Sequence, residues 1–254
     1  MFLKEAHSVI SKKVAEIINQ KPLLSNYYLN DLDDSDYYQT EKSIIIRKKE
    51  DHFFRLYCVT TEASDLRNIL SNMVGNFVIN IPTKGSIESW SEILQLCGFN
   101  QIGIYERYVN LKPLKINYFN ATFAEMSHFN ALKKMMYNNF NMYIDYLPND
   151  NLLKKLIENN QIIIHIEHDK LVGLFIFAMI GKKCDLKVWI DRSGDGLFLL
   201  LNLFGLMNQN NILFSHTWIN SQNEKSKKIH QYFGYKLDNL KDYIFHRNTD
   251  CHQI

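Results

Sequence analysis

Two stretches of this chain pass through the same order of predicted elements, and this repeat constrains the fold more than any other feature. Residues 43–110 predict strand, strand, helix, strand, helix, strand, and residues 171–246 predict the same order. A Gly-aromatic pair separates the last helix from the last strand in both, Gly98-Phe99 and Gly234-Tyr235. An internal duplication is the simplest interpretation. A coincidental β-α-β-α-β order is the alternative.

The first half begins with apolar residues at helical spacing and continues through an uninformative polar stretch, residues 25–41, which is interpreted as irregular. Lys112-Pro113-Leu114 then interrupts the pattern, so we expect one domain over residues 1–113 and a second over 114–254. The predicted elements of the first half are a helix at 3–20, strands at 43–47 and 52–60, a helix at 62–73, a strand at 76–81, a helix at 86–96 and a strand at 99–110.

The second half starts with a predicted helix at 122–139, where Thr122 and Glu125 have the spacing of a capping box. A three-stranded antiparallel meander follows a second helix, and the fold class is α/β with a mixed sheet. The remaining predicted elements are a helix at 150–159, strands at 161–167, 171–180 and 184–190, a helix at 196–208, a strand at 212–218, a helix at 222–233 and a strand at 235–246.

Charge and cysteine usage exclude several classes of protein. The balance of 29 Lys+Arg against 27 Asp+Glu gives a net charge of +2, so we expect no nucleic-acid partner. No apolar run approaches the roughly 18 residues of a membrane span, and residues 1–7 lack a signal core, which predicts a cytoplasmic protein without a membrane partner. The 4 cysteines form no CxxC pair, so no metal site is expected.

Three local patterns in the second half point to chemistry. The first is a polar turn leading into Val172-Gly173, which many hairpins share. The second is a two-glycine loop between a strand and an apolar helix, where backbone amides and the helix dipole favour a pyrophosphate, although the loop alone also serves simply to join the elements. The third is the spacing of Asn223, Ser226, Ile229, His230, Phe233, Gly234 and Tyr235.

These patterns together resemble the GNAT superfamily of N-acetyltransferases, and the resemblance covers essentially all of the second half. The third pattern matches the family's Asn-x-x-Ala-x-x-Leu-Tyr-x-x-x-Gly-Phe segment. The resemblance implies two tandem GNAT-like acyl-CoA N-acyltransferase domains, with acetyl-CoA as co-substrate of the second domain. The first half keeps the element order but has no glycine loop, and Ile87 and Leu94 replace Asn223 and His230, so it is expected to be a degenerate copy with little or no cofactor binding.

The resemblance also implies which residues contact the cofactor. Asn223 is expected to contact the pantetheine arm, and the backbone of Trp189 and Ile190 to hold the thioester carbonyl. Lys227, with Lys225 and Lys228, could meet the nucleotide phosphates, although a plain exposed helix face explains these lysines equally well. The family has Gln or Arg where this chain has Asp191, and Arg192 is one position away from that place. The expected pyrophosphate loop comprises Asp191, Arg192, Ser193, Gly194, Asp195 and Gly196.

The catalytic roles have more than one candidate residue or more than one interpretation. His230 stands where the family has a tyrosine, and three roles stay open for it: an acid, a base, or a histidine packed beside Phe233 without chemistry. Asp185, Asp191 and His216 are candidates for the base that neutralises the attacking amine, and each could instead be an ordinary strand residue.

The sequence therefore predicts an acetyl-CoA-dependent N-acetyltransferase that acts on a primary amine of a small molecule, amino sugar or peptide. A catalytically silent acyl-CoA-binding or protein-interaction module is the rival interpretation, and a scaffold with neither property is a third. The acceptor and the oligomeric state stay open, a homodimer included.

Overall fold

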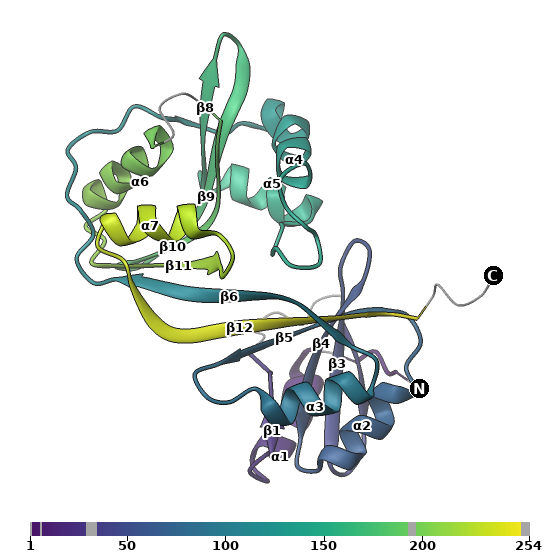
Figure 1. The fold of residues 1–254 in the computed structure, drawn as a ribbon. Helices are drawn as coiled ribbons and strands as arrows, with labels where there is room; N and C mark the ends of the chain where they lie inside the picture. The colour runs from purple at the N-terminus through teal and green to yellow at the C-terminus, as the bar shows by residue number, and fades with distance from the viewer. Residues whose placement is uncertain (1, 6, 29–34, 193–196, 250–254) are drawn as a thin grey trace. The chain divides into compact units, whose positions relative to one another are not determined.

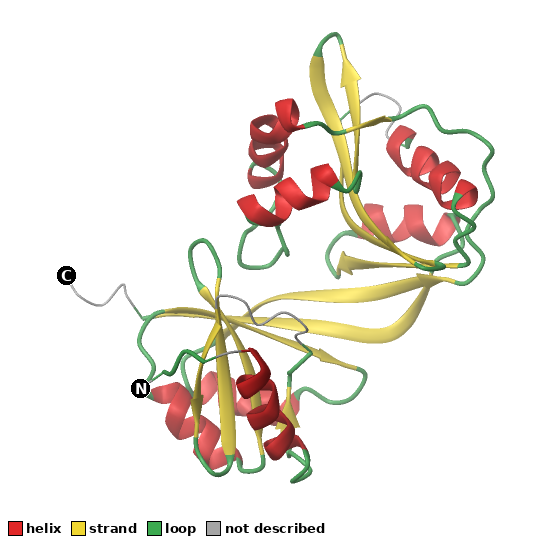
Figure 2. Cartoon of the chain, turned by 180° about the vertical axis from the view of Figure 1, so that it is seen from behind, coloured by secondary structure: helices red, strands yellow, loops and turns green. Residues whose placement is uncertain are grey.

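Two units of the chain each carry helices on both faces of a mixed sheet in the computed structural model, which describes residues 2–5, 7–28, 35–192 and 197–249 (Figures 1 and 2). The described residues divide into two units. Unit 1 comprises Met1–Ile104 together with Lys241–Ile254, and unit 2 comprises Tyr105–Leu240.

Unit 1 orders its strands β2-β3-β4-β5-β12, with β1 on β4. Strands β4 and β5 are parallel, and they pair only over Phe54–Leu56 and Phe77–Ile79. The elements of this unit are α1 (His7–Ile18), β1 (Leu24–Ser25), β2 (Ser35–Gln39), β3 (Ser43–Lys49), β4 (Phe54–Thr60), α2 (Ala63–Ser71), β5 (Asn76–Thr83) and α3 (Glu88–Leu96).

Both faces of this sheet are buried because α1 covers one and α2 with α3 covers the other. Ile44 and Ile46 contact the apolar face of α1, whereas Ile45 between them belongs to the core under α2 and α3. A strand buried on both faces reads as a continuous apolar run. This explains the uninterrupted Ile44-Ile45-Ile46 sequence.

Unit 2 orders its strands β6-β11-β10-β9-β8-β7. Helices α6 and α7 cover one face over a core of Leu186, Phe204 and Tyr235, and α4 with α5 covers the other over Val188 and Ile190. The elements are β7 (Thr122–Phe123), a 3-10 turn (Met126–His128), α4 (Phe129–Tyr137), α5 (Asp150–Glu158), β8 (Ile162–Glu167), β9 (Lys170–Ile180), β10 (Lys183–Asp191), α6 (Phe198–Gln209), β11 (Phe214–Asn220) and α7 (Glu224–Tyr232).

Two long strands, β6 (Asn100–Asn110) and β12 (Lys236–Asn248), run from one unit into the other. In unit 2, β11 pairs antiparallel with Tyr105–Asn110 of β6, and in unit 1, β5 pairs antiparallel with Lys241–Asn248 of β12. Each unit thus receives the last strand of the other half of the sequence. The division at 113/114 stays a prediction, and the two units described here differ from it in that each includes the last strand of the other half.

Arg247 shows how firmly β12 belongs to unit 1. The residue is 6% exposed, and its guanidinium donates to the carbonyls of Leu70, Met73 and Cys97, at 2.8 Å each. These carbonyls lie at the C-terminal ends of α2 and α3, where helices leave acceptors unsatisfied. A residue near the C-terminus therefore completes two helices formed by residues 63–96.

The segment after β6 crosses α6 at Gly205. A Cβ atom on Gly205 would lie 1.7 Å from the carbonyl oxygen of Tyr118, so only glycine fits there. Asn208, one turn further along, donates to the Ile116 carbonyl at 3.2 Å. Residues 116–121 therefore form a strap over α6, and Ile116 and Phe119 add to its core.

Two local predictions were wrong. The helix expected over 122–139 begins later, because Thr122 and Phe123 pair with β8 as strand β7, and the capping box is formed by Glu125 with His128 instead of Thr122 with Glu125. Residues 25–41, interpreted as irregular, contain β2, which is held as a strand by antiparallel pairing with β3.

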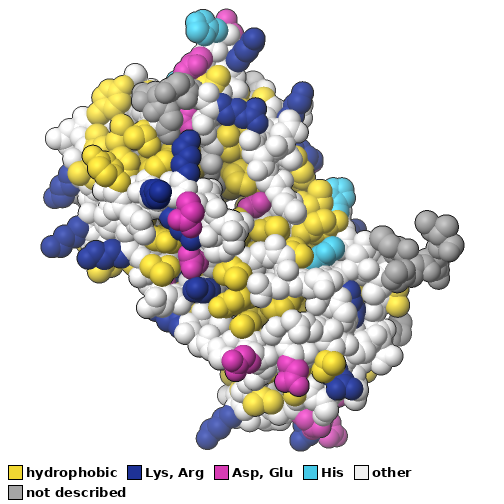
Figure 3. All heavy atoms as spheres, viewed as in Figure 1, with side chains coloured by type: hydrophobic (Ala, Val, Ile, Leu, Met, Phe, Trp, Pro, Cys, Tyr) yellow, Lys and Arg dark blue, Asp and Glu magenta, His cyan; other side chains and the backbone are white. Residues whose placement is uncertain are grey.

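The surface carries both signs of charge, and the face seen in Figure 3 shows basic and acidic side chains interspersed. None of the helices described here is both long and apolar enough to cross a bilayer.

Candidate functional site

Strands β10 and β11 separate along their length, and this separation defines the candidate site. They pair in parallel over Lys183–Leu186 and Phe214–Thr217, after which β10 continues against β9 and β11 against β6. We call the stretch beyond Leu186 and Thr217 the β10–β11 gap. Within the described residues no strand pairs with β10 on this side.

The backbone of β10 presents alternate residues to the gap. The N–H of Arg192 donates to Val172 on β9 at 3.0 Å, and neighbouring residues of a strand direct their polar groups to opposite sides. The N–H and C=O groups of Trp189 and Asp191 therefore point toward the gap. Those of Ile190 point toward β9, so of the predicted pair Trp189-Ile190 only Trp189 offers its backbone to the gap.

A bulge in β10 aims the Trp189 side chain. Lys187 is the extra residue, because Leu186 pairs with Phe177 and Val188 already pairs with Ile176. The bulge places the side chain of Trp189 on the same face as Leu186, in the core under α6 and α7. Its ring stacks on Phe175 at 5.9 Å between centroids.

The glycine of the Val172-Gly173 pair lies opposite Asp191, at the end of β10. A Cβ on Gly173 would stand 2.8 Å from Leu199 Cδ1 and 3.0 Å from the Ile190 carbonyl oxygen. A side chain here would displace the tip of Leu199 on the first turn of α6 and press on the backbone of β10. The glycine of the hairpin pattern noted in the sequence thus allows a close approach of Leu199, in the first turn of α6, to β9.

Among the described residues, no side chain caps the start of helix α6. Leu197 occupies the N-cap position, and the first turn carries no acidic residue. The first amides and the positive dipole end of a helix favour an anion. Ser193, Gly194, Asp195 and Gly196 lie outside the described residues. Arg192, at the start of the same loop, donates to Asn139 Oδ1 at 2.8 Å.

His230 lies on α7 in the core, 3% exposed, with its ring edge-on to Trp189 at 5.9 Å. Its Nδ1 is 2.8 Å from the Ser226 carbonyl oxygen, which can only accept, so Nδ1 carries the proton. Burial lowers the pKa of His230 below its ordinary value, and the Ser226 carbonyl partly opposes this. A neutral imidazole with its N–H committed to Ser226 is a weaker proton donor than an imidazolium, and the acid, base and packing roles of His230 all stay predictions.

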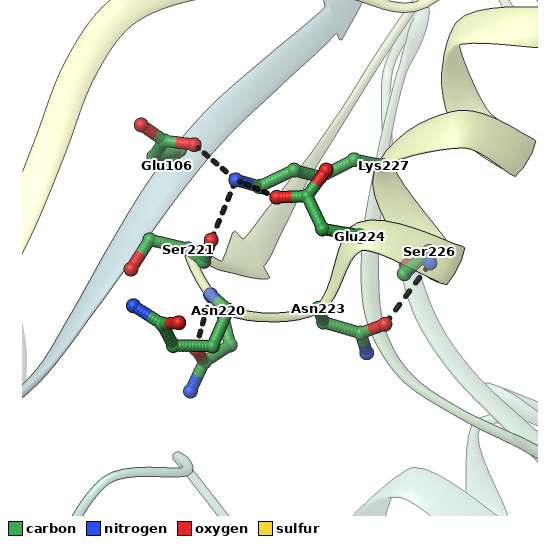
Figure 4. A network of polar contacts seen from close by, with 8 residues as sticks. Glu106, Asn220, Ser221, Asn223, Glu224, Ser226 and Lys227 are labelled. Carbon is green, nitrogen blue, oxygen red and sulfur yellow. Dashed lines mark hydrogen bonds and ion pairs between the residues drawn. The ribbon is translucent and has the colours of Figure 1, made fainter.

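Asn223 and Lys227 lie at the start of α7 (Figure 4). Asn223 caps the helix, because its Oδ1 accepts from the Ser226 N–H at 3.0 Å. The ammonium of Lys227 donates to the Ser221 carbonyl at 2.6 Å and to Glu224 at 3.0 Å, and it pairs with Glu106 at 3.1 Å. Three acceptors use all three donors of this ammonium, so Lys227 as found here joins α7 to β6.

Asp185 and His216 are neighbours across the parallel part of β10 and β11. His216 Nε2 lies 3.3 Å from Asp185 Oδ1, and both side chains are half-buried. Burial lowers the pKa of His216 below its ordinary value, Asp185 opposes this, and Arg107 adds to it. Both residues alternate with Cys184 and Ser215, so they occupy the face opposite α6 and α7.

Sequence reasoning missed the groups that surround these residues. Glu106, the partner of Lys227, and Arg107, which donates to Asp238 at 2.9 Å, both come from β6. The local pattern of residues 100–110 does not predict that this strand pairs with β11. The alternation of Glu106 and Arg107 onto opposite faces is the one signal that was available.

Comparison with known proteins places the fold. No family model and no curated protein matches the chain. Among solved structures, an acetyltransferase from the GNAT family of Colwellia psychrerythraea has a TM-score of 0.54 at 12% identity, with 97% of each chain covered. A tandem GNAT protein from the clavulanic acid biosynthesis pathway has a TM-score of 0.57 at 6% identity, with 98% of each chain covered.

A GCN5-related N-acetyltransferase from Sphaerobacter thermophilus has a TM-score of 0.58 at 9% identity, covering 85% of this chain and 81% of that one. Identities this low establish the fold and nothing more. The predicted fold class, an α/β mixed sheet arranged as two tandem GNAT-like halves, is confirmed.

Proposed function

We propose that this protein is an acetyl-CoA-dependent N-acetyltransferase whose cofactor site is the β10–β11 gap of unit 2. Its acceptor is a primary amine of a small molecule, amino sugar or peptide. The observation that carries the proposal is the separation of β10 from β11 next to the start of α6.

The chain's own groups fit an acyl-CoA at this gap. Coenzyme A joins an extended arm with two amides to a pyrophosphate. The Trp189 carbonyl, on the gap side of β10, is an acceptor for an amide N–H of the extended arm, as in β-strand addition. The first amides of α6 suit the pyrophosphate. Asn223 uses Oδ1 as a cap, and its amide NH₂ is the group that would meet the arm.

Acetyl-CoA would supply the acetyl group as a thioester. The Trp189 N–H would bind the carbonyl oxygen and stabilise negative charge that develops there. His216 is neutral near pH 7 because burial lowers its pKa, so it can take the proton that the acceptor amine must lose as the N–C bond forms. Asp185 would stabilise the resulting imidazolium. The C–S bond would break in the same transfer, and the departing coenzyme A thiolate would take up a proton from solvent. The rest of catalysis is orientation of the two reactants.

One observation favours a second candidate function. His230 replaces the tyrosine that the resemblance leads one to expect, and its N–H is committed to Ser226. A unit with an intact binding gap but no proton donor at this place would bind acyl-CoA without turnover. A silent acyl-CoA-binding or protein-interaction module is therefore the rival.

Calorimetric titration with acetyl-CoA and desulfo-CoA tests binding. The intact chain is compared with Gly196→Trp, whose ring would block the expected pyrophosphate loop, and with Gly85→Trp, a matched control in an exposed turn of unit 1. We expect binding by the intact chain and the control, and loss in Gly196→Trp. Absence of binding by the intact chain would sink the proposal.

A thiol-release assay with a panel of primary amines then separates the two candidates. Release of coenzyme A that depends on both the amine and the intact chain supports the transferase. Binding without release for any amine of the panel selects the silent module.

A further inference from the structure

Unit 1 contains a gap equivalent to the β10–β11 gap, and its own chain fills it. Strands β4 and β5 cease to pair after Leu56 and Ile79. Strand β1 enters on this side of β4, with Leu24 opposite Thr60 and Ser25 opposite Val59. The next residue, Asn26, is 3% exposed and lies between the two separating strands.

Asn26 forms hydrogen bonds with the backbones of both β4 and β5. Its N–H donates to the Cys58 carbonyl at 3.1 Å, and its Oδ1 accepts from the Cys58 N–H at 2.6 Å. Its Nδ2 donates to the Leu56 carbonyl on β4 at 3.1 Å and to the Asn80 carbonyl on β5 at 2.9 Å. One side-chain amide thus takes up backbone groups that the separation of β4 from β5 would leave unpaired.

Cys58 is the counterpart of Trp189. Leu56 and Leu186 each end the parallel pairing of their strand. Cys58 pairs with β3, and Trp189 pairs with β9. In each case the paired residue lies two positions away from the residue that pairs with the leucine. Both side chains belong to the core under the two helices that follow, α2 and α3 in one unit and α6 and α7 in the other.

The residues around Asn26 are fixed as well. Leu24 is part of the core under α2 and α3, and Tyr28 packs edge-on against Tyr57 at 5.4 Å. Asn80 donates to Asp242 at 2.9 Å and accepts from Arg55, and all three are buried. This polar network holds the filled gap closed from the side of β5.

We propose that Leu24–Asn26 permanently occupies the place in unit 1 that corresponds to the acyl-CoA site of unit 2, so that one chain binds one acyl-CoA. The Asn26 amide takes the position at Cys58 that an amide or thioester carbonyl of the ligand takes at Trp189. The statement about unit 2 rests on the proposed function. The statement about unit 1 rests only on the contacts of Asn26.

Hydrogen exchange of the full chain, with and without acetyl-CoA, tests both statements. In the free protein the Cys58 amide should exchange slowly and the Trp189 amide fast. Acetyl-CoA should slow exchange at residues 188–191, leave 57–60 unchanged and bind with a stoichiometry of one in calorimetry. Slowing at 57–60 by acetyl-CoA, or two molecules bound per chain, would overturn the proposal.

The same experiment separates this inference from the proposed function. If acetyl-CoA changes neither segment, the proposed function fails, and the Cys58 amide of the free protein still decides the inference. Slow exchange at Cys58 supports the occupied gap. Fast exchange there, in a chain whose β3 and β4 amides are otherwise protected, rejects it.

Asn26→Ala probes the side chain, with Asn19→Ala as the matched control because Asn19 is exposed after α1. Loss of the Oδ1 acceptor should speed exchange of the Cys58 amide by about tenfold. The control should leave it unchanged. Equal exchange at Cys58 in Asn26→Ala and the intact chain would contradict the role assigned to Asn26, and if Asn26→Ala does not fold, the measurements on the intact chain decide.

Discussion

His216 and His230 lie on opposite sides of the sheet of unit 2, and their surroundings give them different chemistry. His230 is packed between aromatic rings, edge-on to Trp189 and to Tyr235, with its Nδ1 committed. His216 is half-buried beside a carboxylate. At the residue scale, the first is suited to filling space without charge and the second to exchanging a proton.

The first prediction concerns the pH dependence of acyl transfer. If His216 is the base, activity rises as pH passes upward through its pKa, which lies below the ordinary 6.5 because burial dominates. Asp185→Asn removes the charge that raises this pKa, so the rise should move to lower pH. His216→Asn should lower kcat by about 100-fold. Steady-state rates with a responsive amine from pH 5 to 9 measure both effects.

Lys183→Gln is the control for the His216 profile. Lys183 also lowers the pKa of His216, so removing its charge should move the rise in the opposite direction to Asp185→Asn. Identical profiles for the intact chain and both variants would exclude His216 as the base.

The second prediction concerns the acid stability of unit 2. The folded-state pKa of His230 is below its unfolded value, so the unfolded chain binds more protons below about pH 6.5. The stability that neutral His230 contributes is present above that pH and is lost as pH falls toward the folded-state pKa. Urea unfolding at pH 7.5 and pH 5 should show a smaller loss for His230→Phe than for the intact chain. An equal loss in both would contradict the buried neutral state.

At the scale of elements, the strap of residues 116–121 and helix α6 approach so closely that one glycine decides whether both can keep their places. The strap also hydrogen-bonds the exposed side of α6 through Asn208. Because α6 begins beside the β10–β11 gap, the strap fixes an element that borders the candidate site.

Gly205→Ala is therefore the third prediction. The added methyl would overlap the Tyr118 carbonyl, and neither backbone can yield without loss of packing, so the free energy of unfolding should fall by about 3 kcal/mol. Gly85→Ala is the control, because its Cβ would meet only Thr83 Oγ1 at 3.6 Å. Urea denaturation of both variants measures the difference. A loss no larger than the control's would mean that the strap does not press on α6.

At the scale of the whole molecule, the shared strands make each unit dependent on both halves of the sequence. Unit 1 needs Lys241–Asn248 beside β5, and unit 2 needs Tyr105–Asn110 beside β11. Cutting the chain between the halves leaves strand edges unpaired and removes Arg247 from the ends of α2 and α3.

The fourth prediction is that fragments 1–113 and 114–254 do not fold alone. Fragment 1–113 lacks β12 of unit 1, and fragment 114–254 lacks β6 of unit 2. Circular dichroism and amide exchange of the separate fragments should therefore show no cooperative unfolding. Mixing the fragments during refolding should restore the transition of the intact chain. Cooperative folding of 114–254 by itself would favour the division at 113/114 instead.

The sequence by itself determined the order of most elements and the faces they bury. Periods of 3.6 and 2 correctly predict helices α2, α3 and α7 and strands β3 to β6. This works because the burial of one or two faces sets the spacing of apolar residues that are close in sequence. The Asn223 cap is local in the same sense, since its partner is three residues away. The loop expected to bind pyrophosphate, residues 193–196, stays a prediction.

Only the tertiary structure decided which strand lies beside which. The exchange of β6 and β12, the entry of Leu24–Asn26 beside β4 and the Glu106 partner of Lys227 join residues far apart in the chain. Backbone hydrogen bonds between strands are nearly the same for any sequence. Local patterns therefore predict that a strand forms but not which other strand pairs with it. Close approach, as at Gly205 and Gly173, is fixed by the packing of distant backbone and carries no periodic signal.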